Sequence, residues 1–177
     1  MNWILETERL RLREIEEEDY DALCFMLRDA EVMYAYEHAF SEEEAWDWLR
    51  RQRERYRRDG FGLWAVIRKA DGMLIGQCGL TMQPWQGRMV PEVGYLFCKD
   101  VWHQGYATEA ARAARDYAFS ALSLEEVWSI IRVNNLPSRR VAERNGMQVR
   151  GQIVKHYYGI EMPHVGYSVR REEREAL

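Results

Sequence analysis

The sequence lacks a long hydrophobic run, a low-complexity tract and a Gly/Ser-rich linker. Apolar residues nowhere continue for the roughly 20 positions that a membrane-spanning helix needs. Residues 1–6 become charged without a basic start and an apolar run, so they do not resemble a signal peptide. These absences favour a single cytoplasmic domain over residues 1–177, with its core at about residues 7–170 and no membrane partner.

An excess of positive charge is also missing. The chain carries 25 Lys and Arg residues against 29 Asp and Glu, a net charge of −4, so we expect no nucleic-acid partner. The three cysteines, Cys24, Cys78 and Cys98, are odd in number and lack metal-ligand spacing, which favours buried, reduced thiols. The four histidines lack such spacing too, so we expect no metal.

Hydrophobic periodicity predicts a mixed α/β domain of the α+β kind. Alternating apolar residues predict strands at residues 8–15, 61–68, 73–82, 91–98, 125–133, 148–158 and 164–170. Apolar residues three or four apart predict helices at about residues 16–27, 41–58, 106–121 and 137–145. Ser41 with Glu44 forms a capping box, Asp71-Gly72 marks a hairpin, and Gly146 ends a helix. The order gives antiparallel strands first and then a β-α-β crossover.

The segment at residues 95–110 reads YLFCKDVWHQGYATEA. A buried strand ends, a short loop contains Gly105, and an Ala-rich helix follows. The start of a helix offers free backbone N–H groups and the positive end of the helix dipole, which suit a pyrophosphate. The loop lacks the Gly-Lys-Ser/Thr of a P-loop and the further glycines of a dinucleotide fingerprint. An ordinary strand-to-helix turn with a packing glycine is the alternative.

A second segment, at residues 134–147, reads NNLPSRRVAERNGM. Taken alone, its Asn135 and Ser138 are typical of helix caps. Together, however, the two segments resemble the motif pair of the GNAT superfamily of acetyltransferases. That pair is Gly-x-Gly/Ala at a helix start and Asn-x-x-Ser/Ala-x-x-Val/Leu-x-Glu-Arg/Lys-x-Gly-Met/Phe. Segments 6–13, 76–79, 92–95 and 105–110 resemble the branch of ribosomal-protein N-terminal (alanine/serine) acetyltransferases and their small-amine relatives.

The resemblance implies a single-domain GNAT fold and acetyl-CoA as the cofactor. Its mixed, mostly antiparallel sheet would have seven strands, with about four helices and a splayed central strand pair. The end of the central strand would pair with the pantetheine arm, and the loop amides would hold the pyrophosphate. The implied cofactor-binding residues are Leu96, Phe97, Cys98, Trp102, His103, Gln104, Gly105, Tyr106, Ala107, Thr108, Asn135 and Ser138.

The same resemblance implies direct attack of a neutral amine on the thioester in a ternary complex. Glu92 is the candidate general base, with a strand-end surface glutamate as the alternative. Many members carry a Tyr acid where this chain has Ala142, so Ser138 is the candidate for protonating the leaving thiolate, with helix capping as the alternative. We do not expect an acyl-cysteine at Cys98, because an apolar strand end offers no activating group.

The acceptor would be a primary amine, on a protein N-terminus or a small molecule. Expected contacts come from the loop between the early helices, the loop at residues 83–90 and the last hairpin. They are Tyr36, Trp85, Glu92 and Tyr157. Exposed aromatics there are equally consistent with a dimer contact, so monomer and homodimer both stay open. The alternatives to an enzyme are a non-catalytic acyl-CoA-binding or sensing module, which Ala142 keeps open, and a nucleotide-binding domain.

Overall fold

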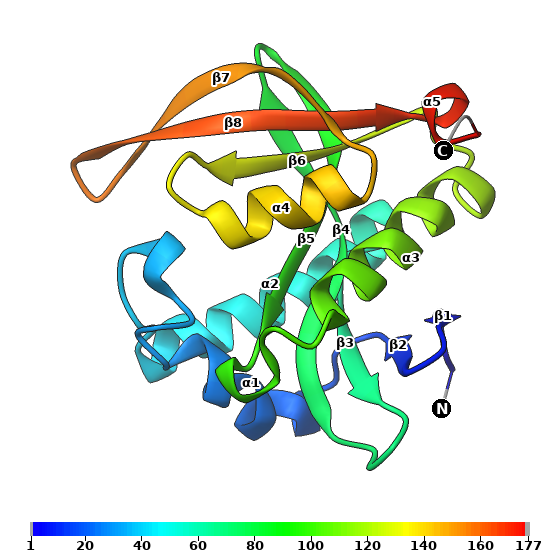
Figure 1. The fold of residues 1–177 in the computed structure, drawn as a ribbon. Coiled ribbons are helices and arrows are strands. Elements are labelled where there is room, and N and C mark those ends of the chain that lie inside the picture. Colours follow the sequence, from blue (N-terminus) through cyan, green and yellow to red (C-terminus); the bar gives the residue numbers. More distant parts are fainter. Residues whose placement is uncertain (1, 176–177) are drawn as a thin grey trace.

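The computed structural model describes residues 2–175, which form one eight-stranded sheet in the order β1-β2-β3-β4-β5-β6-β8-β7 (Figure 1). All neighbouring strands are antiparallel except β5 and β6, which are parallel. The strands are β1 Leu5–Glu6, β2 Leu10–Arg13, β3 Leu63–Arg68, β4 Leu74–Trp85, β5 Arg88–Phe97, β6 Glu126–Arg132, β7 Gln148–Tyr157 and β8 Ile160–Arg170. The parallel pair lies at the centre of the sheet, where the crossover through α3 enters.

Helices cover both faces of the sheet. They are α1 Tyr20–Leu27, α2 Glu42–Asp59, α3 Tyr106–Ser120, α4 Leu136–Arg144 and α5 Arg171–Glu175. The helices α1 and α2 pack on one face of β3, in a cluster that includes Leu27, Leu49 and Ala65. The helices α3 and α4 pack on the opposite face, where the small side chains of α3 allow a close approach. None of the helices described is long and apolar enough to cross a membrane.

Local signals explain the helix ends that the sequence predicted. The capping box is confirmed: Glu44 N donates to Ser41 Oγ at 3.2 Å, and Ser41 N donates to Glu44 Oε2 at 2.8 Å. Gly60 ends α2 with a φ of 79°, a left-handed conformation that glycine adopts without strain. These contacts lie within a few residues of each other, so they can be read from the sequence.

The number of strands and the extent of the central hairpin differ from the expectation. The short β1 and the helix α5 were not predicted, so the sheet has eight strands rather than seven. The expected loop at residues 83–90 is wrong, because β4 continues to Trp85 and β5 begins at Arg88. Gln86 and Gly87 join them with φ values of 45° and 82°, the pattern of a two-residue hairpin turn. Gln is uncommon at a position with positive φ, so the turn carried no clear signal.

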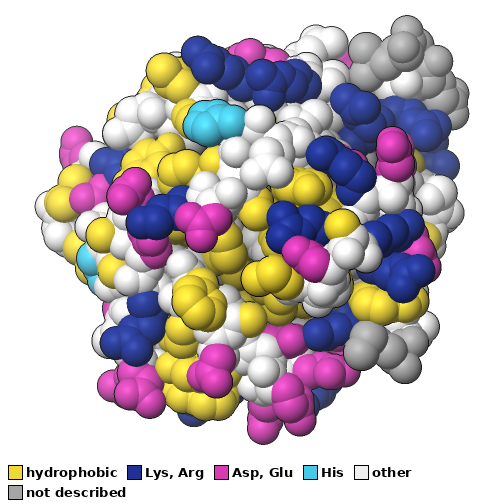
Figure 2. Space-filling view, turned by 60° about the horizontal axis from the view of Figure 1, so that its bottom comes forward, with side chains coloured by type: hydrophobic (Ala, Val, Ile, Leu, Met, Phe, Trp, Pro, Cys, Tyr) yellow, Lys and Arg dark blue, Asp and Glu magenta, His cyan; other side chains and the backbone are white. Residues whose placement is uncertain are grey.

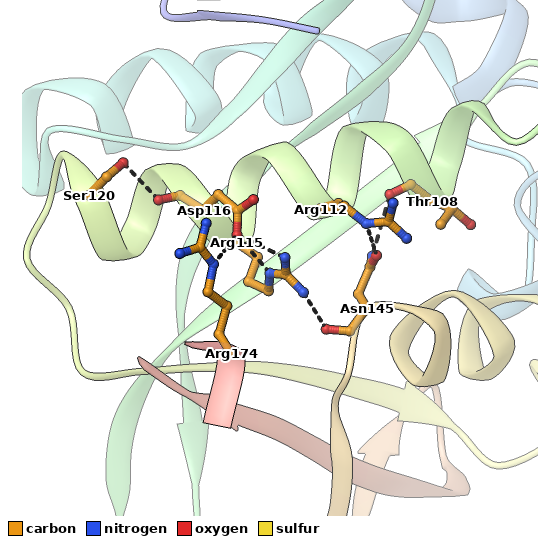
Figure 3. Close-up of polar contacts among 7 residues, drawn as sticks. All are labelled: Thr108, Arg112, Arg115, Asp116, Ser120, Asn145 and Arg174. Atoms are coloured by element: carbon orange, nitrogen blue, oxygen red, sulfur yellow. Dashed lines mark hydrogen bonds and ion pairs between the residues drawn. The ribbon is translucent and has the colours of Figure 1, made fainter. Parts of the chain in front are cut away.

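A polar network fixes α3 against the C-terminal ends of α4 and the sheet (Figure 3). Arg115 Nη1 donates to the carbonyl oxygen of Asn145 at 2.7 Å, and Asn145 Nδ2 donates to the carbonyl of Thr108 at 3.4 Å. Asp116 on α3 accepts from Arg174 Nε on α5 at 3.3 Å. Asn145 is only 2% exposed, so its paired polar groups are part of the core. The network fixes the first turn of α3 relative to α4, and both helices border the site.

Candidate active site

An opening in the sheet lies between the parallel strands β5 and β6. Only Glu92 and Trp128 are paired across it, and the strands diverge beyond them. Two side chains bond to backbone groups that this divergence leaves without a strand partner. Ser129 Oγ donates to the carbonyl of Val93 at 3.1 Å, and the Ile130 N–H donates to Glu92 Oε2 at 2.7 Å. The expected splayed central pair is therefore confirmed.

The backbone of β5 presents hydrogen-bonding groups to this opening, of which the carbonyl of Phe97 already accepts from Trp102 Nε1 at 3.0 Å. Cys98 N donates to the carbonyl of Ile75 on β4, and backbone groups in an antiparallel pair alternate in direction. Leu96 therefore points its backbone groups toward β4, whereas Tyr95 and Phe97 point theirs toward the opening. Of the three residues expected to pair with pantetheine, only Phe97 has its backbone groups at the open edge. Tyr95, which was not among the expected residues, has its backbone groups at the same edge, and the alternation of the strand was the signal for this placement.

A cavity of about 710 Å³ runs along this opening and reaches both faces of the sheet. On the face of α3 and α4 it is lined by the loop before α3 and by the start of α4. On the opposite face it is lined by Tyr36, Trp48, Glu92 and Tyr157, among others. The cavity therefore has two chambers, one on each face of the sheet, which are connected through the gap between β5 and β6. On the side of the molecule turned forward in Figure 2, acidic and basic side chains are interspersed with hydrophobic ones.

The N-terminus of α3 suits a pyrophosphate. Gly105 is the N-cap residue with a φ of 82°, and no side chain caps the helix, so the amides of its first turn are available. Of the loop and first turn, the residues that line the cavity are Trp102, His103, Gly105, Tyr106, Ala107 and Thr108. Gln104 does not line it: its carbonyl accepts from Arg9 Nη1 at 2.9 Å, and its side chain donates to the carbonyl of Asp100. The other loop residues fit the predicted role.

Arg9 on the N-terminal segment supports this loop, and the sequence reading gave it no role. Its Nε donates to Glu109 Oε2 at 2.7 Å, and its guanidinium lies 4.3 Å from the ring centre of Tyr106. Glu109 Oε1 also accepts from Thr7 Oγ1 at 2.6 Å and from the N–H of Arg9. These contacts join residues about 100 positions apart, and both ends lie in segments that carry the family resemblance. Arg9 and Glu109 thus fix the loop before α3 to the N-terminal segment.

The start of α4 faces the same chamber. Asn135 is the N-cap residue, and its Oδ1 accepts from Ser138 N at 3.3 Å and from Tyr34 Oη at 2.6 Å. Tyr95 Oη donates to the carbonyl of Ser138 at 2.8 Å. The cap is therefore Asn135, and the Ser138 hydroxyl has no hydrogen-bond partner among the described residues and lines the cavity. Ala142 is only 2% exposed, so its methyl group belongs to the core.

Glu92 lies in the wall of the cavity rather than at an exposed strand end. The strand begins at Arg88, four residues before Glu92, so Glu92 is not the strand-end surface glutamate that the alternative interpretation described. Burial raises the pKa of Glu92 to about 6, while Lys155, the Ile130 N–H and Arg55 act to lower it. A carboxyl group with a pKa just below neutrality is mostly ionised at pH 7 and can still take up a proton, which is the requirement for a general base.

The expected acceptor contacts divide into two groups. Tyr36 and Tyr157 line the cavity with Glu92, and their contact with an acceptor stays a prediction. Trp85 does not: it is 2% exposed and packs on Trp128, with ring centres 5.1 Å apart. A Cβ at Gly166 would lie 2.2 Å from the Trp85 ring, so this glycine makes room for the indole. The proposed contact of Trp85 with the acceptor is therefore corrected to a packing role.

Cys98 also lies outside the cavity lining. Its side chain packs against the clusters on both faces of the sheet, and burial raises the pKa of its thiol. A thiol with a raised pKa is a poor nucleophile at neutral pH, which agrees with the structural role expected for it. Within residues 2–175, no three His, Cys, Asp or Glu side chains are grouped so that they could hold a metal ion.

Comparison with known proteins identifies the class that this geometry defines. A family model described as an acetyltransferase (GNAT) domain matches residues 9–148. The chain belongs to this family and is an acetyl-CoA-dependent acyltransferase. The uncharacterized protein YkkB of Bacillus subtilis is 35% identical over 152 residues, which cover 85% of this chain and 88% of YkkB.

Two further relatives agree with this. The FsC-acetyl coenzyme A-N(2)-transacetylase of Aspergillus fumigatus is 32% identical over 184 residues, covering 96% of this chain and 77% of that protein. The crystal structure of a GNAT-family acetyltransferase from Bacillus anthracis superposes with a TM-score of 0.80 and 26% identity. The superposition covers 95% of this chain and 98% of the Bacillus anthracis chain.

Proposed function

We propose that this protein is an N-acetyltransferase that moves the acetyl group of acetyl-CoA to a primary amine of a small molecule or a protein N-terminus. The observation that carries the proposal is the single cavity that joins the uncapped start of α3 to Glu92 through the strand opening. Acetyl-CoA supplies the acetyl group as a thioester. CoA occupies the chamber on the face of α3 and α4, the cofactor chamber, and the amine occupies the chamber on the opposite face, the acceptor chamber. The two substrates meet at the strand opening, without a covalent enzyme intermediate.

The side chains and amides of the cavity divide the remaining work. The first-turn amides of α3 bind the pyrophosphate, and the N–H of Phe97, whose carbonyl is engaged by Trp102, bonds to the pantetheine arm along the edge of β5. An amide N–H at this edge also suits the thioester oxygen, where negative charge develops. Glu92 accepts the proton of the attacking amine, directly or through a water molecule, and the Ser138 hydroxyl donates a hydrogen bond to the leaving thiolate.

The test is release of free thiol from acetyl-CoA in the presence of a panel of primary amines, with product mass measured to locate the acetyl group. Affinity for CoA is measured separately by calorimetry. Thiol release that depends on both substrates supports the proposal. Tight binding of CoA without turnover on any acceptor supports the non-catalytic module instead, for which Ala142 at the position of the usual Tyr acid is the argument. Stabilisation by ATP but not by CoA contradicts both.

A further inference from the structure

Three cations line the acceptor side of the cavity near Glu92. Arg51 and Arg55 lie one turn apart on α2, and Lys155 lies on β7. In the described part of the chain, no carboxylate lies within ion-pair distance of any of the three. Arg55 donates to the neutral amide oxygen of Gln52 at 3.2 Å. The positive charge of this chamber is therefore left without a fixed partner.

The carboxylates that share the chamber wall are already engaged. Glu44 Oε1 lies 2.9 Å from His38 Nε2, and Asp47 pairs with Arg50 at 3.1 Å. Glu92 accepts from the Ile130 N–H. Arg55 and Lys155 are also partly buried, whereas Arg51 is exposed. Burial, together with neighbouring Arg51 and Arg58, lowers the pKa of the Arg55 guanidinium. A charge removed from water without a partner is unfavourable, so a ligand that supplies an anion would gain affinity here.

This arrangement constrains the acceptor. A polyamine or another multiply cationic amine would bring further positive charge beside Arg55 and Lys155, which is repulsive. A guanidinium is planar and presents paired donors, which match the two oxygens of a carboxylate or the oxygens of a phosphate. Arg55, Lys155 and Glu92 line the same cavity, so one acceptor molecule can contact the base and the cations together.

Resting on the proposed function, we propose that the acceptor is a small amine that also carries an anionic group, a carboxylate or a phosphate. Arg55, with Arg51 and Lys155, binds the anionic group while the amine faces Glu92. The cations thus select among amines, and they take no part in the transfer of the acetyl group.

The first test uses pairs of acceptors that differ only in the anion. Tyrosine with tyramine and ornithine with putrescine test the carboxylate, and O-phosphoethanolamine with ethanolamine tests the phosphate. We expect kcat/KM to be at least about tenfold higher for the anionic member of one type of pair. Equal or better turnover of the amines that lack the anion, or of a C-terminally amidated peptide without acidic side chains, overturns the inference and leaves the proposed function intact. Turnover of no acceptor overturns both.

The second test uses variants of α2 on the preferred pair. Arg55→Gln is expected to raise KM for the anionic acceptor about tenfold or more, with little effect on the counterpart that lacks the anion, and Arg55→Lys is expected to restore part of the preference. Arg58→Gln is the matched control, because Arg58 pairs with Asp59 on the same helix and does not line the cavity. An equal loss on both acceptors in Arg55→Gln, or the same loss in Arg58→Gln, would contradict the assignment.

Discussion

Replacing Glu92 with Gln should lower turnover and, at neutral pH, stabilise the fold. Burial raises the pKa of this carboxyl from 4.5 to about 6. Below pH 4.5 the group is protonated in both the folded and the unfolded protein, so it does not affect stability. Between pH 4.5 and about 6 the unfolded carboxyl ionises while the buried one stays protonated, so stability falls across this range and levels off above it, where both forms are ionised. At about 1.4 kcal/mol for each pH unit, the upper limit of this loss is about 2 kcal/mol, reduced by water in the cavity.

Glu92→Gln cannot ionise, and its amide oxygen can still accept the Ile130 N–H. We therefore expect its free energy of unfolding to exceed that of the wild type by up to about 2 kcal/mol at pH 8, with a smaller difference at pH 5. Urea unfolding at the two pH values measures this. A variant that is less stable than the wild type at pH 8 would refute the argument that the charged form is disfavoured in the folded state.

The same variant should lose on the order of 100-fold in kcat/KM, because a general base typically contributes two to four orders of magnitude. The wild-type profile of kcat/KM against pH should rise with an apparent pKa near 6, and the variant should lack this limb. The acceptor amine produces its own rise at higher pH, which both proteins should show. CoA affinity serves as the control and should be unchanged. Wild-type turnover in Glu92→Gln would remove this residue from the mechanism.

Three further substitutions test the cofactor chamber. Ser138→Ala should lower kcat, with CoA affinity and melting temperature retained, since Asn135 rather than Ser138 caps α4; unchanged kcat would exclude the hydroxyl. Gly105→Val should abolish CoA binding by calorimetry, because it places a β-branched residue at a φ of 82°; Gly72→Val, at a φ of 73° in open space, is the control for strain alone. Arg9→Met should weaken CoA binding severalfold by releasing the Gln104 carbonyl, and an unaltered Kd would show that the loop needs no support.

Much of the cofactor chamber could be predicted because its signals are local. A glycine before an Ala-rich helix and an Asn three residues before a Ser are patterns within single segments, and the free amides follow from the helix start itself. The family resemblance, rather than these patterns alone, assigned them to a cofactor. The fold class followed from the order of elements, and the splayed central strand pair followed from the family resemblance. The side chain of Trp85 could not be placed in this way, because its environment depends on Gly166 and Trp128, which lie on strands far away in the sequence.

The sequence by itself determined most of the helices and strands, and which loop carries the free amides, but not β1, α5 or the reversal at Gln86 and Gly87. These properties depend on backbone preferences and contacts over a few residues. Tertiary structure alone decided that Glu92 faces a cavity with a pKa near 6, that Arg9 supports the loop before α3, and that Arg55 lies in the acceptor chamber without an acidic partner. Burial and charge pairing depend on which distant elements surround a side chain, and the packing of the sheet and its helices fixes that environment.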